Sequence, residues 1–277
     1  MKYSPLALLP IFVLLAVSCH REELDYGRVN VHFDVAVTDL SAGAGGAAAT
    51  KAAGDGLSAT QLLVGVLDAE GNPLEGYKQV VVRPVGENFS FDLKLLENME
   101  YQVLFFAQSE NYYIPVTEYM ESSTSTAVLR TVPLRSSPAM NSDAADAFAG
   151  VKSITSYEPS QSITLTRIGA QVNVASFAAV AAGTPVTLSV SKVPVQYDVV
   201  TGEASGEQTV TLSGMSSGGP SFVSGGAAYY PLAYGYVPVG KGGATVDVTV
   251  KVNDDIKAEV ASVPLKPNYK TNIMGDI

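Results

Sequence analysis

Two short segments have the residue spacing of known catalytic or cofactor-binding motifs. The first, Gly-Met-Ser-Ser-Gly at residues 214–218, fits the G-x-S-x-G pattern of a nucleophilic serine. Such a serine requires a helix after it and a histidine that accepts its proton. Here Gly219 and Pro220 break the chain after the motif, and the only histidines are His20, near the N-terminus, and His32, in a segment with strand periodicity. The motif therefore indicates a loop, and the sequence predicts no catalytic residue.

The second segment contains Gly43, Gly45 and Ala48, which fit a relaxed dinucleotide-binding fingerprint. That fingerprint needs a helix whose first turn binds the pyrophosphate. Residues 41–56 are instead mostly glycine and alanine, and a strand-type run follows them. We expect a flexible loop or linker here, and the sequence predicts no cofactor.

The residue types that bind metals are scarce. One cysteine and two histidines cannot build a zinc site of the Cys/His type, and no D-x-D-x-D-G calcium loop occurs. The net charge of −10 disfavours binding to nucleic acid and to anionic lipid head groups. A hydrolytic pair among the 27 acidic residues stays open, although the lack of tryptophan argues against a sugar-hydrolysing site. The sequence predicts no metal and favours a protein that is not an enzyme.

Four tyrosines form the one dense aromatic group in the second half of the chain. Alternating tyrosines on a strand usually pack in or beside the core, and otherwise they can form a surface that binds a glycan or a host protein. The members of this candidate ligand patch are Tyr229, Tyr230, Tyr234 and Tyr236.

The N-terminus has the features of an export segment. Lys2 supplies a positive charge, and the apolar run at residues 6–17 is too short to span a bilayer as a helix. The run ends in Ser18-Cys19, preceded by small residues, which resembles the lipobox of bacterial lipoprotein signals. The resemblance implies a signal peptide at residues 1–18 and acyl chains such as palmitate on Cys19, the only cysteine.

Residues 19–27 would then be a lipid-anchored tether. Its acidic residues follow Cys19 directly and resemble the surface-export signal of Bacteroidota lipoproteins, although they also suit a solvated tether. We therefore expect a lipoprotein of the outer membrane that is exposed at the cell surface.

Strand periodicity dominates the rest of the sequence. Residues 28–37 alternate apolar and polar positions, as in a half-buried strand. Residues 61–83 have the pattern of a hairpin, and strand-type segments recur at regular spacing from residue 160 onward. The pattern predicts an all-β protein. The apolar positions of the first strand are Val29, Val31, Phe33, Val35 and Val37.

A single helix is predicted, at residues 141–149, where Asn141 or Ser142 can cap a short run with acidic residues in its first turn. We place the boundary between two domains in the surrounding segment. The predicted domains are residues 28–158 and residues 159–277.

Several segments resemble fimbrillin-like lipoproteins of Bacteroidota, a family that includes stalk, anchor and tip subunits of type V pili and many other surface lipoproteins. The resemblance implies two tandem transthyretin-like Greek-key β-sandwich domains, with the helix between them. The segments that carry it are Met99–Gln108, Asp143–Phe148, Leu165–Val174 and Asn268–Gly275.

The same resemblance implies a route to assembly. In stalk subunits of the family a protease cuts after a basic residue in the linker behind the first strand, and a neighbour's strand replaces the strand that is lost. The matching bond here joins Lys51 and Ala52, although Lys51 can also be a solubilising residue only. No strand is predicted between the closing segment and Ile277, where a stalk subunit would carry its donor strand, so a terminal or non-polymerising protein is expected.

The sequence thus predicts a non-enzymatic cell-surface lipoprotein, either an accessory pilus subunit or an adhesin. Its expected partners are the outer membrane, through the lipid on Cys19, and other pilus subunits, through strand addition. The alternative is a surface module that binds a glycan or a host protein and does not polymerise.

Overall fold

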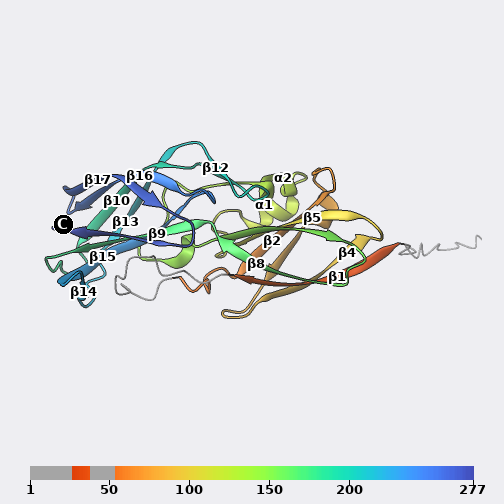
Figure 1. Cartoon of the computed structure of the whole chain (residues 1–277), viewed down its shortest axis with the longest axis horizontal. Coiled ribbons are helices and arrows are strands. Elements are labelled where there is room, and N and C mark those ends of the chain that lie inside the picture. The colour runs from red at the N-terminus through yellow and green to blue at the C-terminus, as the bar shows by residue number, and fades with distance from the viewer. Residues whose placement is uncertain (1–26, 38–53) are drawn as a thin grey trace, which may run out of the picture.

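The computed structural model describes residues 27–37 and 54–277 (Figure 1). The predicted signal peptide, Cys19, the tether up to residue 26, and the Lys51–Ala52 bond lie outside the described residues. Strands dominate the described chain and its helices are short, which confirms the predicted all-β class. Figure 1 shows an elongated molecule in which the start of the first strand and the C-terminus lie at opposite ends.

The first sheet has seven strands in the order β3-β2-β5-β7-β8-β1-β4. It folds over, so that apolar side chains of β1 and β4 face those of β2 and β5 in one core. Phe33 lies at the centre of this core, with its ring 5.3 Å from that of Phe91 and 5.7 Å from that of Phe105. The strands are β1 (Arg28–Val37), β2 (Gln61–Asp68), β3 (Gln79–Val82), β4 (Phe89–Leu96), β5 (Glu100–Gln108), β7 (Phe148–Thr155) and β8 (Ser160–Arg167).

Two four-stranded sheets, β13-β10-β16-β17 and β14-β15-β9-β18, enclose a second core that is rich in valine. Strands β10 and β16 alternate buried residues with more exposed ones, because successive side chains point to opposite faces of a sheet, whereas β9 is buried along its whole length. The strands are β9 (Gly169–Ser176), β10 (Pro185–Val193), β13 (Gln208–Met215), β14 (Phe222–Ser224), β15 (Ala227–Pro238), β16 (Ala244–Val252), β17 (Asp255–Leu265) and β18 (Lys270–Gly275).

A third apolar cluster covers the other face of β2 and β5 and joins the two halves of the molecule. It includes Tyr119 and Leu129 from two short helices and Tyr197 from a small three-stranded sheet. Because β2 and β5 are buried on both faces, their sequences are continuous apolar runs rather than alternating ones. The added elements are η1 (Glu75–Tyr77), α1 (Val116–Glu121), α2 (Ser125–Arg130), β6 (Thr131–Pro133), η2 (Asp143–Ala145), β11 (Gln196–Asp198) and β12 (Ala204–Ser205).

The predicted helix at residues 141–149 is wrong in extent. The backbone N–H of Ala144 donates to the Ser142 hydroxyl, 3.1 Å away, so the predicted cap is present. Only a single turn, η2, follows it, and β7 begins at Phe148. Phe148 is fully buried in the first core, and the burial available in the sheet outweighs a weak helix start. Helices α1 and α2 were not predicted.

Strand β8 lies on the C-terminal side of the predicted domain boundary, yet it pairs with strands from the other side. Residues 160–165 run parallel to residues 32–37 of β1, and the last two residues of β8 pair with the start of β7. The first sheet therefore draws on both predicted domains. The division at residues 158–159 and the transthyretin-like Greek-key topology stay predictions.

Candidate functional site

Ser216, the serine of the G-x-S-x-G pattern, is part of a turn. The Ser216 hydroxyl donates to the carbonyl of Ala181 at 2.5 Å and accepts from the backbone N–H of Thr184 at 3.3 Å. His32 lies on β1, with its ring 2.9 Å from the carboxylate of Asp92 on β4. Among the residues that the structure describes, no group of three His, Cys, Asp or Glu side chains could hold a metal ion. In the same part of the chain, no helix is long and apolar enough to cross a membrane.

Strand β1 is an interior strand of the first sheet. It pairs antiparallel with β4 on one side and parallel with β8 on the other. Val31, Phe33 and Val35 are fully buried, whereas Val29 and Val37 at the two ends are partly buried. All five apolar residues predicted for this strand therefore pack against the first core. Without β1, the backbone of two neighbouring strands would lose hydrogen-bond partners and the core would be open to water.

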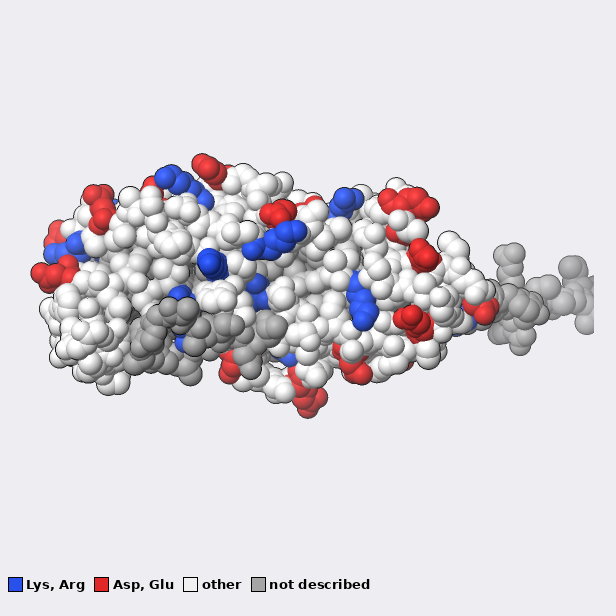
Figure 2. Space-filling model, viewed as in Figure 1, with Lys and Arg blue, Asp and Glu red and all other residues white. Residues whose placement is uncertain are grey.

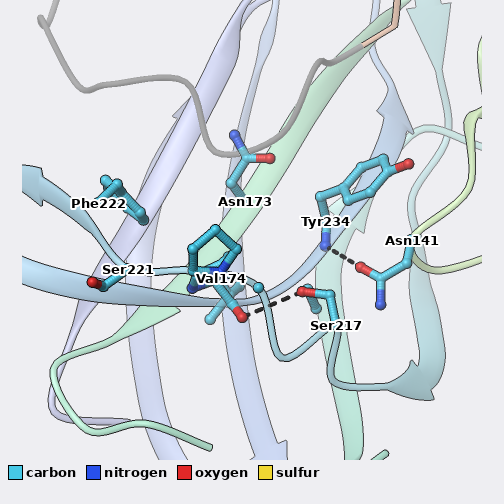
Figure 3. A pocket seen from close by; sticks show the side chains of 11 residues that line it. Asn141, Asn173, Val174, Ser217, Ser221, Phe222 and Tyr234 are labelled. Carbon is cyan, nitrogen blue, oxygen red and sulfur yellow. Dashed lines mark hydrogen bonds between the residues drawn. The ribbon is translucent and has the colours of Figure 1, made fainter. Parts of the chain in front are cut away.

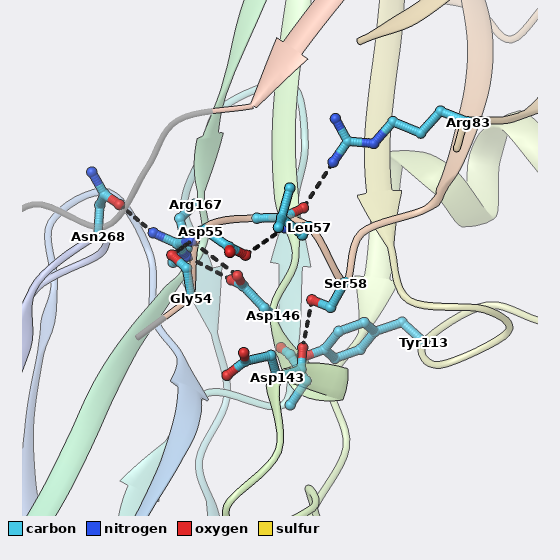
Figure 4. Close-up of polar contacts among 12 residues, drawn as sticks. Gly54, Asp55, Leu57, Ser58, Arg83, Tyr113, Asp143, Asp146, Arg167 and Asn268 are labelled. Atoms are coloured by element: carbon cyan, nitrogen blue, oxygen red, sulfur yellow. Dashed lines mark hydrogen bonds and ion pairs between the residues drawn. The ribbon is translucent and has the colours of Figure 1, made fainter. Parts of the chain in front are cut away.

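Residues 54–58, which follow the linker, are held in place by hydrogen bonds to distant parts of the chain. The carbonyl oxygen of Gly54 accepts a hydrogen bond from Arg167 at 2.6 Å, and that of Gly56 accepts one from Arg83 at 2.7 Å (Figure 4). The Ser58 hydroxyl donates to the carbonyl of Asp143 at 2.8 Å. Residues 54–58 are thus tied to the body of the protein by contacts that do not involve β1.

Arg167 is also half of a buried ion pair. Its Nε and Nη2 atoms lie 2.6 and 2.9 Å from the two carboxylate oxygens of Asp146, and both side chains are fully buried (Figure 4). Nη1 donates to Asn268 at 2.7 Å, and the guanidinium lies 4.7 Å from the ring centre of Phe148. Burial raises the pKa of Asp146 to about 6, although the hydrogen bonds and charge of Arg167 act in the opposite direction.

The four tyrosines of the candidate ligand patch have different environments. Tyr236 is fully buried near Arg167, where burial raises the pKa of its hydroxyl, and it offers no exposed surface. Tyr230 is half-buried opposite Ser176 of β9. Tyr229 and Tyr234 are also partly buried, and burial together with the nearby Asp143 raises the pKa of Tyr234 to about 12. The structure does not bring the four into one surface.

Tyr234 instead lines a cavity of about 400 Å³, which we call the β14 cavity (Figure 3). It lies over β9 and β15, beside the loop that leads into β14. The Asn141 amide fixes this wall, because it accepts from the Tyr234 backbone N–H at 2.9 Å and donates to the carbonyl of Met215 at 2.8 Å. Its polar and aromatic lining comprises Asn141, Asn173, Ser217, Ser221, Phe222 and Tyr234.

Tyr229 is the middle ring of what we call the aromatic stack. Its ring centre lies 4.5 Å from that of Phe177 and 5.8 Å from that of Phe222, with interplanar angles of 29° and 25°. Phe222 also lines the β14 cavity, so the stack and the cavity are continuous.

Sequence reasoning did not single out Asp146, Arg167, Asn173, Phe177 or Phe222 as site residues. Asp146, Arg167 and Asn173 lie in the segments that resemble fimbrillins, but no individual role was predicted for them. Phe177 and Phe222 had no distinguishing pattern. The one usable indication was the tyrosine group, because its neighbours on adjacent strands complete the aromatic stack.

This is an all-β sandwich protein. Its first sheet folds over around β1, and two four-stranded sheets pack face to face in the other half of the molecule. The chain belongs to the family of unknown function DUF6562, whose model matches residues 27–277. No curated protein matches the sequence.

Solved structures with similar folds come from Bacteroidota, the phylum of the fimbrillin-like lipoproteins that the sequence resembles. A candidate adhesin from Bacteroides ovatus has a TM-score of 0.50 and 14% identity, covering 87% of this chain and 78% of its own. A candidate adhesin from Bacteroides thetaiotaomicron has a TM-score of 0.50 and 12% identity, covering 86% and 81%. The fimbrial anchor protein Mfa2 from Porphyromonas gingivalis has a TM-score of 0.45 and 12% identity, covering 84% and 82%. At these identities the likeness concerns the fold alone, and the two candidate adhesins are the structures here that share it at a TM-score of 0.50.

Proposed function

We propose that this chain is a non-enzymatic lipoprotein of the outer membrane, anchored through Cys19 and displayed at the cell surface. There it acts as an accessory pilus subunit or an adhesin. The observation that carries the proposal is the position of β1, an interior strand that fills the first core and precedes a linker with a single basic residue. The adhesin and fimbrial names of the structural neighbours support the same role.

The position of β1 suits strand addition. A cut between Lys51 and Ala52 would separate β1 from the rest of the chain, whereas residues 54–58 would stay bound through Arg167 and Arg83. The vacated groove would present apolar side chains and unpaired backbone groups together, and an extended strand from another pilus subunit satisfies both.

The lipid anchor and the maturation state are tested by one measurement, the N-terminal residue and intact mass of the protein isolated from its native envelope. For an accessory subunit or adhesin we expect a chain that begins at Cys19 and carries acyl chains. A chain that begins at Ala52 would instead identify a polymerised stalk subunit. An unacylated chain that begins anywhere before Cys19 would overturn the lipoprotein assignment.

Two substitutions sharpen this measurement. Cys19→Ala should move the protein out of the membrane fraction, because the acyl chains are the only anchor that we propose. If an Ala52 species is found, Lys51→Gln should abolish it, and Arg28→Gln is the matched control because it removes a positive charge outside the linker. Cleavage that persists in Lys51→Gln would exclude Lys51 as the recognised residue.

The second candidate function is a surface module that binds a glycan or a host protein without polymerising. The β14 cavity and the aromatic stack favour it, because a cavity of about 400 Å³ with aromatic and amide walls has the size and chemistry of a ligand site. A native protein that keeps β1 and binds a ligand through this site would support the second candidate over strand addition.

A further inference from the structure

The outer face of sheet β14-β15-β9-β18 carries aromatic rings in an arrangement that protein packing alone leaves partly exposed. The aromatic stack takes one ring from each of three adjacent segments: Phe222 in β14, Tyr229 in β15 and Phe177 just after β9. Phe177 remains 48% exposed and Phe222 is partly exposed. The rings are close to parallel, and the exposed part of Phe177 together with the partly exposed Phe222 offers aromatic surface to a flat ligand.

The β14 cavity, which shares Phe222 with the stack, contains one polar atom whose hydrogen bond is missing. Asn173 is only 4% exposed, and its Nδ2 donates to Asn272 Oδ1 at 2.8 Å. Its Oδ1 is buried without a partner. In Figure 3 this oxygen lies on the side of the amide that faces Tyr234. A buried carbonyl oxygen without a donor is costly, so the site is suited to a ligand that donates an O–H or N–H there.

The site is also uncharged. None of the described residues that line the β14 cavity is acidic or basic. In Figure 2 the part of the visible surface where Figure 1 places β14 shows no Lys, Arg, Asp or Glu, although charged side chains lie above it at the same end of the molecule. A charged ligand would find no countercharge among these lining residues and would lose hydration without that compensation.

We propose that the β14 cavity and the aromatic stack together bind a neutral saccharide. Pyranose rings pack their C–H faces on Phe222 and Phe177, and a sugar hydroxyl in the cavity donates a hydrogen bond to Asn173 Oδ1. A saccharide meets all three conditions, because it combines flat apolar faces with many hydroxyl donors and no charge. A purely apolar ligand would leave Asn173 unpaired, and an anionic or cationic ligand would find no partner.

The position in the molecule suits capture at a surface. The start of β1, which follows the predicted tether, and strand β14 lie at opposite ends of the elongated molecule (Figure 1). A sugar site at β14 would therefore face away from the anchor. The inference rests on the proposed surface role for its biological meaning, but the binding site itself is a property of the folded chain.

The test is binding of defined neutral oligosaccharides to the purified full-length protein. The probes are maltohexaose, cellohexaose, mannohexaose and xylohexaose, with oligogalacturonate as the charged comparison, and the measurement is isothermal titration supported by saturation-transfer NMR. We expect binding of at least one neutral probe and none of oligogalacturonate. Phe222→Ala and Phe177→Ala should each weaken that binding about tenfold, since each removes one stacking surface.

Val223→Ala is the matched control, because it truncates an exposed apolar side chain next to Phe222 that does not line the cavity. Its affinity should equal that of the unaltered protein, and circular dichroism should show that all three variants are folded. No binding of any neutral probe at millimolar concentration would overturn the proposal, as would binding that survives both phenylalanine substitutions. Because the assay uses purified protein, its failure leaves the lipoprotein and pilus assignments untouched. Conversely, sugar binding by a protein that proves to be unacylated would overturn the anchor alone.

Discussion

The guanidinium of Arg167 binds both carboxylate oxygens of Asp146, at 2.6 and 2.9 Å, with both side chains fully buried. The same guanidinium donates to Gly54, 113 residues away in sequence, and to Asn268, 101 residues away. One arginine at the end of β8 therefore connects the entry of the chain at Gly54, the start of β7 and the turn before β18 (Figure 4). This network is the point at which segments from the whole length of the protein are joined.

Truncating this arginine should strongly destabilise the protein. Arg167→Ala leaves the carboxylate of Asp146 buried without a countercharge, and such a loss typically costs about 3–5 kcal/mol of the free energy of unfolding. Denaturant unfolding followed by circular dichroism measures the change. The matched control is Lys257→Ala, which breaks an exposed ion pair with Asp255 at 3.5 Å and should cost less than about 1 kcal/mol. Equal effects in the two variants would contradict the structural role of Arg167.

The same ion pair predicts a pH dependence of stability. The pKa of Asp146 is about 6 in the folded protein against 3.8 for an unperturbed aspartate, so the folded state binds this proton more tightly than the unfolded chain. Raising the pH from about 3 to about 7 should therefore lower the free energy of unfolding by about 3 kcal/mol through this group. Well above the folded pKa its contribution is constant.

Asp146→Asn provides the comparison for this pH dependence. The variant cannot titrate at residue 146, so its free energy of unfolding should lack this fall between pH 3 and pH 7. Subtracting the two pH profiles isolates the carboxyl from all other groups. Parallel profiles for the two proteins would show that Asp146 keeps an ordinary pKa when folded.

A methyl group at Gly54 should disturb the anchoring of the chain after the linker. A Cβ atom there would lie 1.9 Å from the hydroxyl oxygen of Tyr236 and 3.1 Å from a carboxylate oxygen of Asp146. Gly54→Ala is thus expected to destabilise the protein by about 1–3 kcal/mol, the usual cost of overpacking. Gly76→Ala is the control, because a Cβ atom at Gly76 meets nothing within 4 Å. Thermal unfolding of the two variants measures this difference in stability, and equal stability would contradict overpacking at Gly54.

Truncation within β1 should show how much the first core depends on this strand. Phe33 is fully buried and stacks on Phe91, so Phe33→Ala should cost about 3–5 kcal/mol by leaving a cavity. Asn30→Ala, on the exposed face of the same strand, should change stability by less than about 0.5 kcal/mol. If Phe33→Ala were as stable as Asn30→Ala, β1 would not be the strand that closes the core.

Much of the strand architecture could be predicted from local sequence. The alternation of Val31, Phe33 and Val35 with polar residues follows from the two-residue period of a strand, which needs no knowledge of the rest of the chain. The Ser142 cap was recognised for the same local reason. The length of the helix after it was not, because the choice between helix and strand at Phe148 depends on a core assembled from distant segments.

The candidate sites show the limit of local pattern more sharply. Alternation places Tyr234 and Tyr236 on one face of β15, yet Tyr234 lines a cavity and Tyr236 is buried under Arg167 and Gly54. The sequence by itself determined which residues are apolar and which of them alternate as in strands. Only the tertiary structure decided that Phe177, Tyr229 and Phe222 stack and that Arg167 meets Asp146. Those contacts depend on which strands pair, and strand pairing is set by the packing of the whole core rather than by any one segment.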